Sequence, residues 1–210
     1  MQRKSSRLGR PDKMPLPAVQ KYGSECRNYM QNCKRNAEER RIIMKKAVII
    51  TGPGFQDEEY IYPYYRLQEA GFTVDVATKD KESVKGKYGI TAKPTIDVKD
   101  LKESNYHLVV LPGGHEAPDR VRQIKEVLDF VKAMYEKGKI VSTICHGQWI
   151  LISAGIVKGK KISGYIGIKD DIINAGAEYV DASVVVDGNI ISSPHYKYNG
   201  EWMKETLKKL

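Results

Sequence analysis

Short apolar segments alternate with amphipathic segments from Met44 to the C-terminus, and this alternation restricts the fold more than any other feature of the chain. When strands and helices alternate, successive strands lie parallel in one sheet and the connecting helices cover its faces. We therefore expect an α/β fold with a mostly parallel sheet and helices on both faces. The predicted strands are Lys46–Thr51, Thr73–Thr78, His107–Leu111, Lys139–Ile144 and Ser183–Val186, and the predicted helices are Glu58–Ala70, Arg122–Glu136, Gly147–Ala154, Ile168–Ala175 and Glu201–Leu210. A hairpin over Lys81–Lys93, added to the main sheet, is also predicted.

The segment Lys139–Gly155 holds a strand that runs directly into Cys145-His146-Gly147 and then into a helical pattern. A sharp turn at this point would lift Cys145 out of the sheet and place its sulfur beside the free N–H groups of the helix. Those groups favour the thiolate. The pattern therefore predicts a nucleophile elbow. The alternative is that Cys145 is a small buried hydrophobic residue.

Active sites of parallel sheets gather at the carboxyl ends of the strands. After the first strand, a loop with Gly52 and Gly54 leads to the carboxylates of Asp57–Glu59. The glycine spacing fits neither the dinucleotide nor the P-loop pattern, so nucleotide binding is not expected. Each carboxylate either complements the helix dipole or points at the Cys145 sulfur.

A second loop, after the third strand, contains the pair Gly113-Gly114. Paired glycines let backbone N–H groups approach a substrate closely, because no Cβ stands in the way. This pair predicts an oxyanion hole.

Charge is distributed unevenly along the 210 residues, which carry a formal net charge of +9. Residues 1–43 hold 11 Lys and Arg against 4 Asp and Glu, whereas residues 44–210 hold 24 against 22. We predict a basic, disordered extension over residues 1–43, with a weak helix, a targeting leader or an upstream translation artefact as alternatives. Residues 44–210 form the predicted α/β domain. Its near-neutral charge argues against nucleic-acid binding, which would depend on the basic extension.

The composition also indicates where such a protein works. No apolar run approaches the length of a membrane span. Three cysteines, Cys26, Cys33 and Cys145, are too few and too scattered for a disulfide framework. A cytoplasmic setting is therefore expected, with no membrane partner.

Several ordered motifs resemble one known family. Together they are similar to the PfpI-type intracellular proteases, within the superfamily of the Parkinsonism-associated deglycase and the class I glutamine amidotransferases. The resemblance covers about residues 45–192 and implies a flavodoxin-like three-layer sandwich without metal or cofactor. The motifs are Phe55–Tyr64, Leu111–Gly114, Ala117–Arg122, Ser142–Ala154 and Gly167–Ala175.

The resemblance implies a role for four residues around the elbow. Cys145 would be the nucleophile, and His146 its neighbouring acid or base. Glu59 would hydrogen-bond the cysteine sulfur and, when protonated, hold the thiolate ionised. The backbone N–H groups of Gly114 and His146 would form the oxyanion hole.

Two further site residues follow from the same resemblance, and this sequence departs from the family near one of them. Asp119 would be the third member of a triad, supplied by an adjacent subunit, and Tyr165 matches an active-site tyrosine. The family usually has glutamate at the position of Asp119, and this chain has one extra residue after Gly114. Gln56 replaces a carboxylate, and the divergent segment after Ser193 adds His195, which we interpret as a loop residue.

The implied activity is that of a cofactor-independent cysteine hydrolase, acting on small peptides, on methylglyoxal or on glycated adducts. A homo-oligomer, dimer or hexamer, is expected, and Tyr60, Tyr62, Tyr64 and Tyr65 would line an interface or pack inside the fold. The alternative is a redox sensor or holding chaperone whose cysteine is oxidised without turnover. An amidotransferase subunit is not expected, because a catalytic histidine followed two residues later by an acid is missing near the C-terminus.

Overall fold

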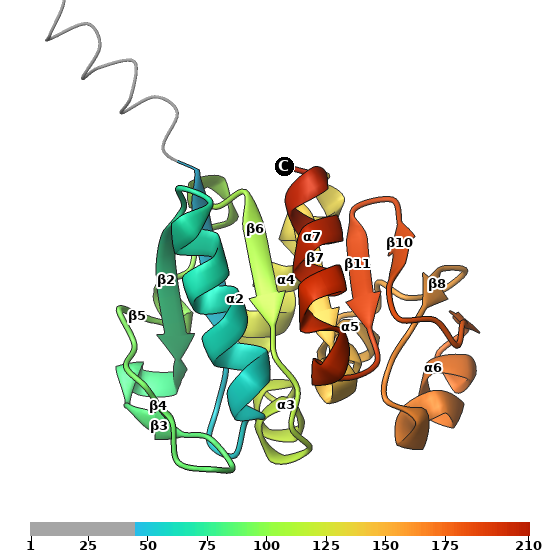
Figure 1. The fold of residues 1–210 in the computed structure, drawn as a ribbon, viewed down its shortest axis with the longest axis horizontal. Helices are drawn as coiled ribbons and strands as arrows, with labels where there is room; N and C mark the ends of the chain where they lie inside the picture. The colour runs from blue at the N-terminus through green and yellow to red at the C-terminus, as the bar shows by residue number, and fades with distance from the viewer. Residues whose placement is uncertain (1–44) are drawn as a thin grey trace, which may run out of the picture. The chain divides into compact units, whose positions relative to one another are not determined.

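The computed structural model describes residues 45–210, which form a seven-stranded sheet with the order β10-β11-β7-β6-β1-β2-β5 (Figure 1). All neighbouring strands are parallel except β10 and β11. This confirms the predicted mostly parallel sheet. The strands are β1 (Lys46–Ile50), β2 (Thr73–Thr78), β5 (Ile96–Asp97), β6 (Leu108–Leu111), β7 (Ile140–Ile144), β10 (Val185–Asp187) and β11 (Ile190–Ser193).

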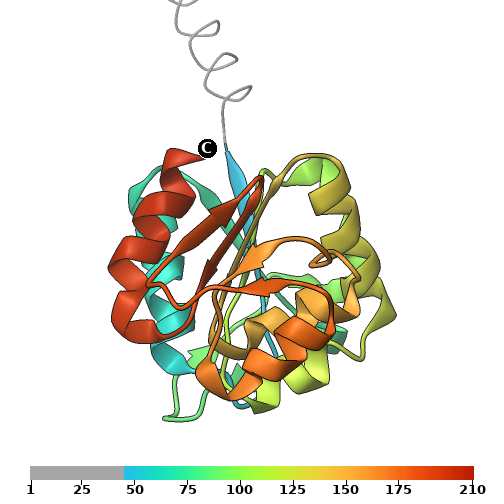
Figure 2. The ribbon, with the colours of Figure 1, turned by 90° about the vertical axis from the view of Figure 1, so that its right-hand side faces the viewer.

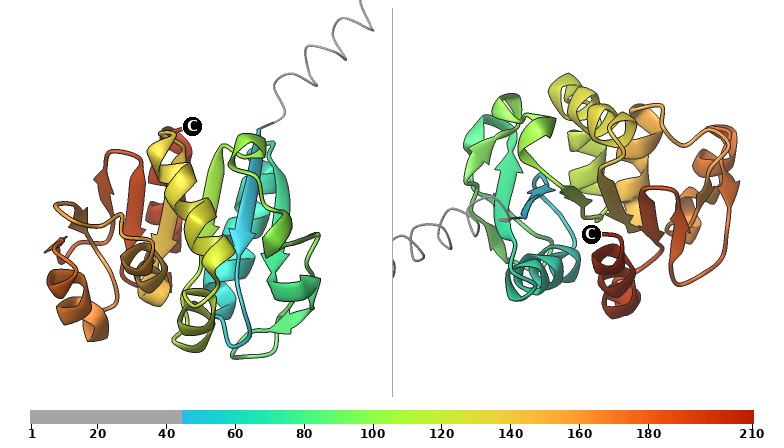
Figure 3. Two further views of the ribbon diagram at one scale, coloured as in Figure 1. Left: turned by 180° about the vertical axis from the view of Figure 1, so that it is seen from behind. Right: turned by 90° about the horizontal axis from the view of Figure 1, so that it is seen from above.

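Helices cover both faces of the sheet, which gives the flavodoxin-like three-layer arrangement. Helices α2 (Asp57–Glu69) and α7 (Asn199–Lys208) lie side by side on one face, as Figures 1 and 2 show. Helices α4 (Lys125–Glu136) and α5 (Gln148–Ser153) lie on the other face, seen from behind and from above in Figure 3. The short helix α3 (Glu116–Val121) contacts α5. Helix α6 (Lys169–Asn174) lies beside the small sheet of β8 (Lys161–Ile162) and β9 (Glu178–Tyr179).

Alternation along the central strands explains why both faces are covered. In β1, Val48 and Ile50 belong to the apolar cluster under α4 and α5, whereas Ala47 and Ile49 belong to the cluster under α2 and α7. Successive side chains of a strand point to opposite faces, so a continuous apolar strand needs a layer of helices on each side. The core therefore consists of two apolar layers separated by the sheet.

The structure corrects the predicted fifth strand. Ser183–Val186 overlaps β10, which is the antiparallel edge strand, and the strand next to β7 is β11, which was not predicted. The two serines of β11 resemble a loop in sequence, yet both are fully buried. Their hydroxyls are satisfied inside the fold, because Ser192 accepts from the N–H of Ser163 at 3.0 Å and Ser193 donates to the carbonyl of Ser183 at 2.8 Å.

The predicted hairpin over Lys81–Lys93 is present, but its place was wrong. Strands β3 (Val84–Lys85) and β4 (Thr91–Ala92) form a separate two-stranded sheet rather than an addition to the main one. The carboxylate of Asp57 accepts 2.8 Å hydrogen bonds from the N–H groups of Tyr88 and Ile90. The hairpin is thereby fastened to the start of α2.

The predicted extension over residues 1–43, with Cys26 and Cys33, lies outside the described residues and stays a prediction. No helix within residues 45–210 is long and apolar enough to cross a bilayer.

Candidate active site

Cys145 stands at the junction of β7 and the helical segment that leads into α5. It opens a 3₁₀ turn, Cys145–Gly147, with a φ of +59°. Non-glycine residues rarely adopt this left-handed conformation, and such backbone strain is typical of functional turns. The side chain is 8% exposed. The predicted nucleophile elbow is therefore confirmed as a backbone feature.

Gly113 brings Glu59 and Cys145 together. Its backbone N–H donates a 2.7 Å hydrogen bond to Oε2 of Glu59, which is fully buried in α2. A Cβ on Gly113 would lie 2.6 Å from both the Cys145 Cβ and Glu59 Oε2. Only glycine therefore permits the two side chains to flank this loop.

The backbone N–H groups of Gly114 and His146 both point at the Cys145 sulfur and lower the pKa of the thiol. Burial acts more strongly in the opposite direction, and a negative charge on Glu59 adds to it, so the pKa of Cys145 is raised overall. The two N–H groups alone therefore do not keep a thiolate at neutral pH. The thiol needs a proton acceptor.

Burial also raises the pKa of Glu59, to about 8, against the opposing effects of the Gly113 N–H and of the Cys145 side chain. Glu59 is therefore mostly protonated at pH 7. Since Oε2 already accepts from Gly113, Oε1 is the oxygen left to carry the proton. Within residues 45–210 that atom has no hydrogen bond of good geometry, which leaves it free to serve the sulfur or a substrate.

His146 lies on the outer side of the sulfur, with Nδ1 3.3 Å from Cys145 Sγ. Its ring stacks on Tyr165 at 4.7 Å between centroids and meets Trp149 edge to face at 5.0 Å. Burial, with a contribution from nearby His115, lowers the pKa of His146 to about 4, although Asp171 acts in the opposite direction. The imidazole is thus neutral at pH 7, and its low pKa makes it a weak base toward a thiol whose own pKa is raised.

Asp119 follows the Gly113-Gly114 loop. It is exposed on α3, at a depression of about 430 Å³ that it shares with His115 and Trp149. No hydrogen bond joins Asp119 to His146 within residues 45–210. The expectation that this acid acts from an adjacent subunit remains a prediction.

Other sequence candidates have local roles. The Glu58 carboxylate accepts a 2.7 Å hydrogen bond from Gln56, so Glu59 is the one carboxylate of Asp57–Glu59 that meets the sulfur. His195 caps its own turn by accepting from the N–H of Lys197 at 3.2 Å. In the described part of the chain, no group of three or more His, Cys, Asp or Glu side chains could hold a metal ion.

Sequence reasoning missed a second layer around His146. The indole N–H of Trp149 donates a 2.8 Å hydrogen bond to Oδ2 of Asp171 on α6, and the Arg122 guanidinium lies 5.5 Å from the indole ring centre. The three-residue spacing of His146 and Trp149 places them one helical turn apart, a signal that could have linked them. The approach of Asp171 depends on tertiary packing.

Comparison with known proteins identifies the arrangement. The sequence profile of the DJ-1/PfpI family matches residues 45–209. The chain belongs to this family. It is 44% identical over 165 residues to a Pyrococcus furiosus protein named Deglycase PfpI, and the aligned region covers 79% of this chain and 99% of the relative. It is 39% identical over 152 residues to the putative cysteine protease YraA of Bacillus subtilis, across 72% of this chain and 89% of the relative.

A solved DJ-1 structure has the same fold. The crystal structure of Drosophila melanogaster DJ-1beta superposes with a TM-score of 0.74 at 28% identity, over 79% of this chain and 90% of that one. Membership of the DJ-1/PfpI family thus accounts for both the motifs and the three-layer architecture.

Proposed function

We propose that this DJ-1/PfpI protein is a cofactor-independent cysteine enzyme that acts on reactive aldehydes such as methylglyoxal and on their adducts. The observation that carries the proposal is the position of Cys145 between the neutral imidazole of His146 at 3.3 Å and the buried, protonated carboxyl of Glu59. The relative named Deglycase PfpI supports the same chemistry.

In the proposed reaction the sulfur attacks the aldehyde carbon of methylglyoxal while the proton of Cys145 passes to His146, so that no free thiolate precedes the attack. The N–H groups of Gly114 and His146 stabilise the resulting alkoxide, which is protonated to a hemithioacetal. A proton then moves from the former aldehyde carbon to the neighbouring carbonyl carbon through Glu59 or His146, and the hydroxyl proton of the hemithioacetal passes to the oxygen of that neighbouring carbon. Water cleaves the thioester that forms, releasing lactate and the thiol. One carbon is oxidised while its neighbour is reduced, so the reaction needs no external oxidant or cofactor.

Hydrolysis of small peptides is the second candidate, and the relative named putative cysteine protease supports it. In this route Cys145 attacks an amide carbonyl and His146 protonates the leaving amine. An acid must then hold the imidazole, and Asp119 of a second copy would supply it. The aldehyde route needs only groups that already surround the sulfur, and we place it first for that reason.

The test is lactate formation from methylglyoxal, with hydrolysis of a peptide amide measured in parallel, for the wild type and Cys145→Ser. We expect lactate formation that is lost in Cys145→Ser and retained in Glu126→Gln, an exposed carboxylate on α4. Peptide hydrolysis alone, again lost in Cys145→Ser, would establish the second candidate instead. If neither substrate turns over while mild peroxide oxidises Cys145, the proposed enzyme is wrong and a redox sensor or chaperone is the better description.

A further inference from the structure

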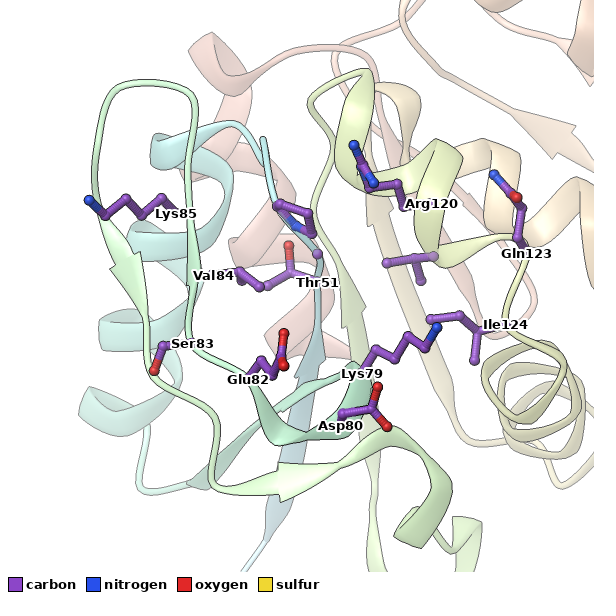
Figure 4. A pocket seen from close by; sticks show the side chains of 13 residues that line it. Thr51, Lys79, Asp80, Glu82, Ser83, Val84, Lys85, Arg120, Gln123 and Ile124 are labelled. Atoms are coloured by element: carbon purple, nitrogen blue, oxygen red, sulfur yellow. The ribbon is translucent and has the colours of Figure 1, made fainter.

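A second cavity lies at the carboxyl edge of the sheet. Its volume is about 750 Å³, within the range of small-molecule sites. It is bordered by the loop after β1, the loop after β2 and the segment around the end of α3 (Figure 4). Neither Cys145, His146 nor Glu59 lines it.

The place of this cavity in the topology is informative. Strands β1 and β6 are neighbours, but the chain leaves β1 toward β2 through α2 on one face and leaves β6 toward β7 through α4 on the other. Open parallel sheets bind ligands in the crevice at such a reversal of strand order. The cavity lies between the loop that follows β1 at Thr51 and the α3 segment at Arg120, which follows β6.

One buried group behind the cavity wall lacks a partner. Thr51 is 2% exposed, and its Oγ1 has no hydrogen bond within residues 45–210. A buried hydroxyl without a partner costs free energy, but neighbouring atoms cover this one, so it lies behind the cavity wall rather than on it. The adjoining loop also contains two consecutive non-glycine residues with left-handed backbone, Asp80 at φ +55° and Lys81 at φ +56°.

The charges around the cavity are mixed. Figure 4 shows Lys79 and Glu82 on the side of the loop after β2, with Arg120 across from them. Arg120 is paired with Glu116 at 2.9 Å. Among the described residues, none of the lining side chains Lys79, Lys85, Asp80 and Glu82 forms an ion pair. Two unpaired ammonium groups and two unpaired carboxylates fit a ligand that carries both charges better than a plain anion.

We propose that this cavity binds a small zwitterion, an amino acid or a short peptide with a free ammonium and a free carboxylate. Glu82 receives the ammonium, and Lys79 and Arg120 receive the carboxylate. The proposal does not depend on the reaction at Cys145.

The experiment is titration calorimetry of the full chain with glycine, glycylglycine and triglycine, after Cys145 has been blocked with iodoacetamide. The best of these ligands is then compared with its N-acetyl and C-amide forms. We expect saturable binding with the active site blocked, and at least a tenfold loss of affinity for each capped form. Glu82→Gln should remove the preference for the free ammonium, and Lys79→Met the preference for the free carboxylate. Lys137→Met, an exposed lysine after α4, is the control and should change neither.

Absence of binding at millimolar concentration of all three ligands would overturn the proposal. Binding of inorganic phosphate that is as strong, and that tightens in Glu82→Gln, would overturn it in favour of a plain anion site. If a variant loses its folded circular dichroism spectrum, the capped ligands on the wild-type protein decide the matter alone.

Discussion

The backbone N–H of Gly113 donates a 2.7 Å hydrogen bond to Oε2 of Glu59, so a loop after β6 holds a fully buried carboxyl of α2 beside Cys145. One N–H bond does not compensate for removing a carboxylate from water. The pKa of Glu59 therefore rises to about 8, and its carboxyl is mostly protonated at pH 7. Both the stability of the fold and the reactivity of Cys145 depend on this proton.

Glu59 should make stability depend on pH. Between its unfolded pKa of ~4.3 and its folded pKa of about 8, the folded chain keeps a proton that the unfolded chain has lost. The contribution of Glu59 to the free energy of unfolding is therefore complete below pH ~4.3, and it falls as pH rises by at most about 1.4 kcal/mol per pH unit. Glu59→Gln lacks this slope. Urea unfolding should therefore show the free energy of unfolding of the variant rising relative to that of the wild type from pH 5 to pH 8.

Glu126→Gln on the surface of α4 is the matched control, and its stability should follow that of the wild type at each pH. A constant difference between Glu59→Gln and the wild type over this range would show that Glu59 is ionised in the fold.

The reactivity of Cys145 should move in a defined direction in Glu59→Gln. When Glu59 loses its proton, its charge opposes the formation of a second negative charge on the sulfur. The amide that replaces the carboxyl in the variant carries no such charge. The rate of Cys145 alkylation by iodoacetamide, followed by peptide mass spectrometry, should therefore begin to rise at a lower pH in the variant. An onset at higher pH would mean that the carboxyl mainly stabilises the thiolate.

The fold was predictable where the pattern is apolar and periodic. Strand β2 was predicted with its observed bounds, and β1, β6 and β7 to within one residue at each end. The failures have a common cause. Strand β11 ends in two serines whose hydroxyls find partners only in the folded protein, and β5 has two residues, too few to show a period.

The parts of the site that local sequence motifs form were predictable. The elbow at Cys145 and the loop at Gly113-Gly114 follow strands that are neighbours in the sheet, so the carboxyl-edge rule brings them together. The contact of Trp149 with Asp171 joins two helices 22 residues apart, and no local pattern specifies it. The function of Asp119 depends on a second copy and stays a prediction.

Gly113→Ala should damage the site through sterics. The added Cβ would lie 2.6 Å from the Cys145 Cβ and from Glu59 Oε2, and both neighbours are buried. We expect a loss of stability of about 1–3 kcal/mol from overpacking and a loss of turnover of about 100-fold from the displaced sulfur.

Gly200→Ala is the matched control for this substitution. At Gly200, in α7, the nearest atom to an added Cβ is the Tyr62 hydroxyl at 3.9 Å, so the change should stabilise the helix by about 0.5–1 kcal/mol. Denaturant unfolding and turnover of both variants check the pair. Equal effects at the two positions would contradict the close approach at Gly113.

Asp119→Asn separates the two candidate reactions. The residue is exposed and makes no hydrogen bond to His146 within the described chain, so the substitution should change stability by less than about 0.5 kcal/mol. Lactate formation should be unaffected. Peptide hydrolysis, if present, should fall at least about tenfold, because the imidazole loses the acid that orients it. A parallel loss of both activities would place Asp119 in the aldehyde route as well.

Asp171 is the residue whose charge raises the pKa of His146, against the stronger effect of burial. Asp171→Asn should therefore lower the pKa of His146 further below about 4, while an amide oxygen can still accept from the Trp149 indole. Proton NMR titration of the His146 ring measures the shift directly. Asp170→Asn, on the adjacent exposed position of α6, should leave the titration unchanged.

Trp149→Phe keeps an aromatic ring beside His146 but removes the indole donor, so Asp171 is freed to move. If the Asp171 charge acts on His146 only because the indole holds Asp171 in place, Trp149→Phe will lower the pKa of His146 as Asp171→Asn does. If the His146 titration is unchanged in both variants, Asp171 has no effect on the electrostatics of the site.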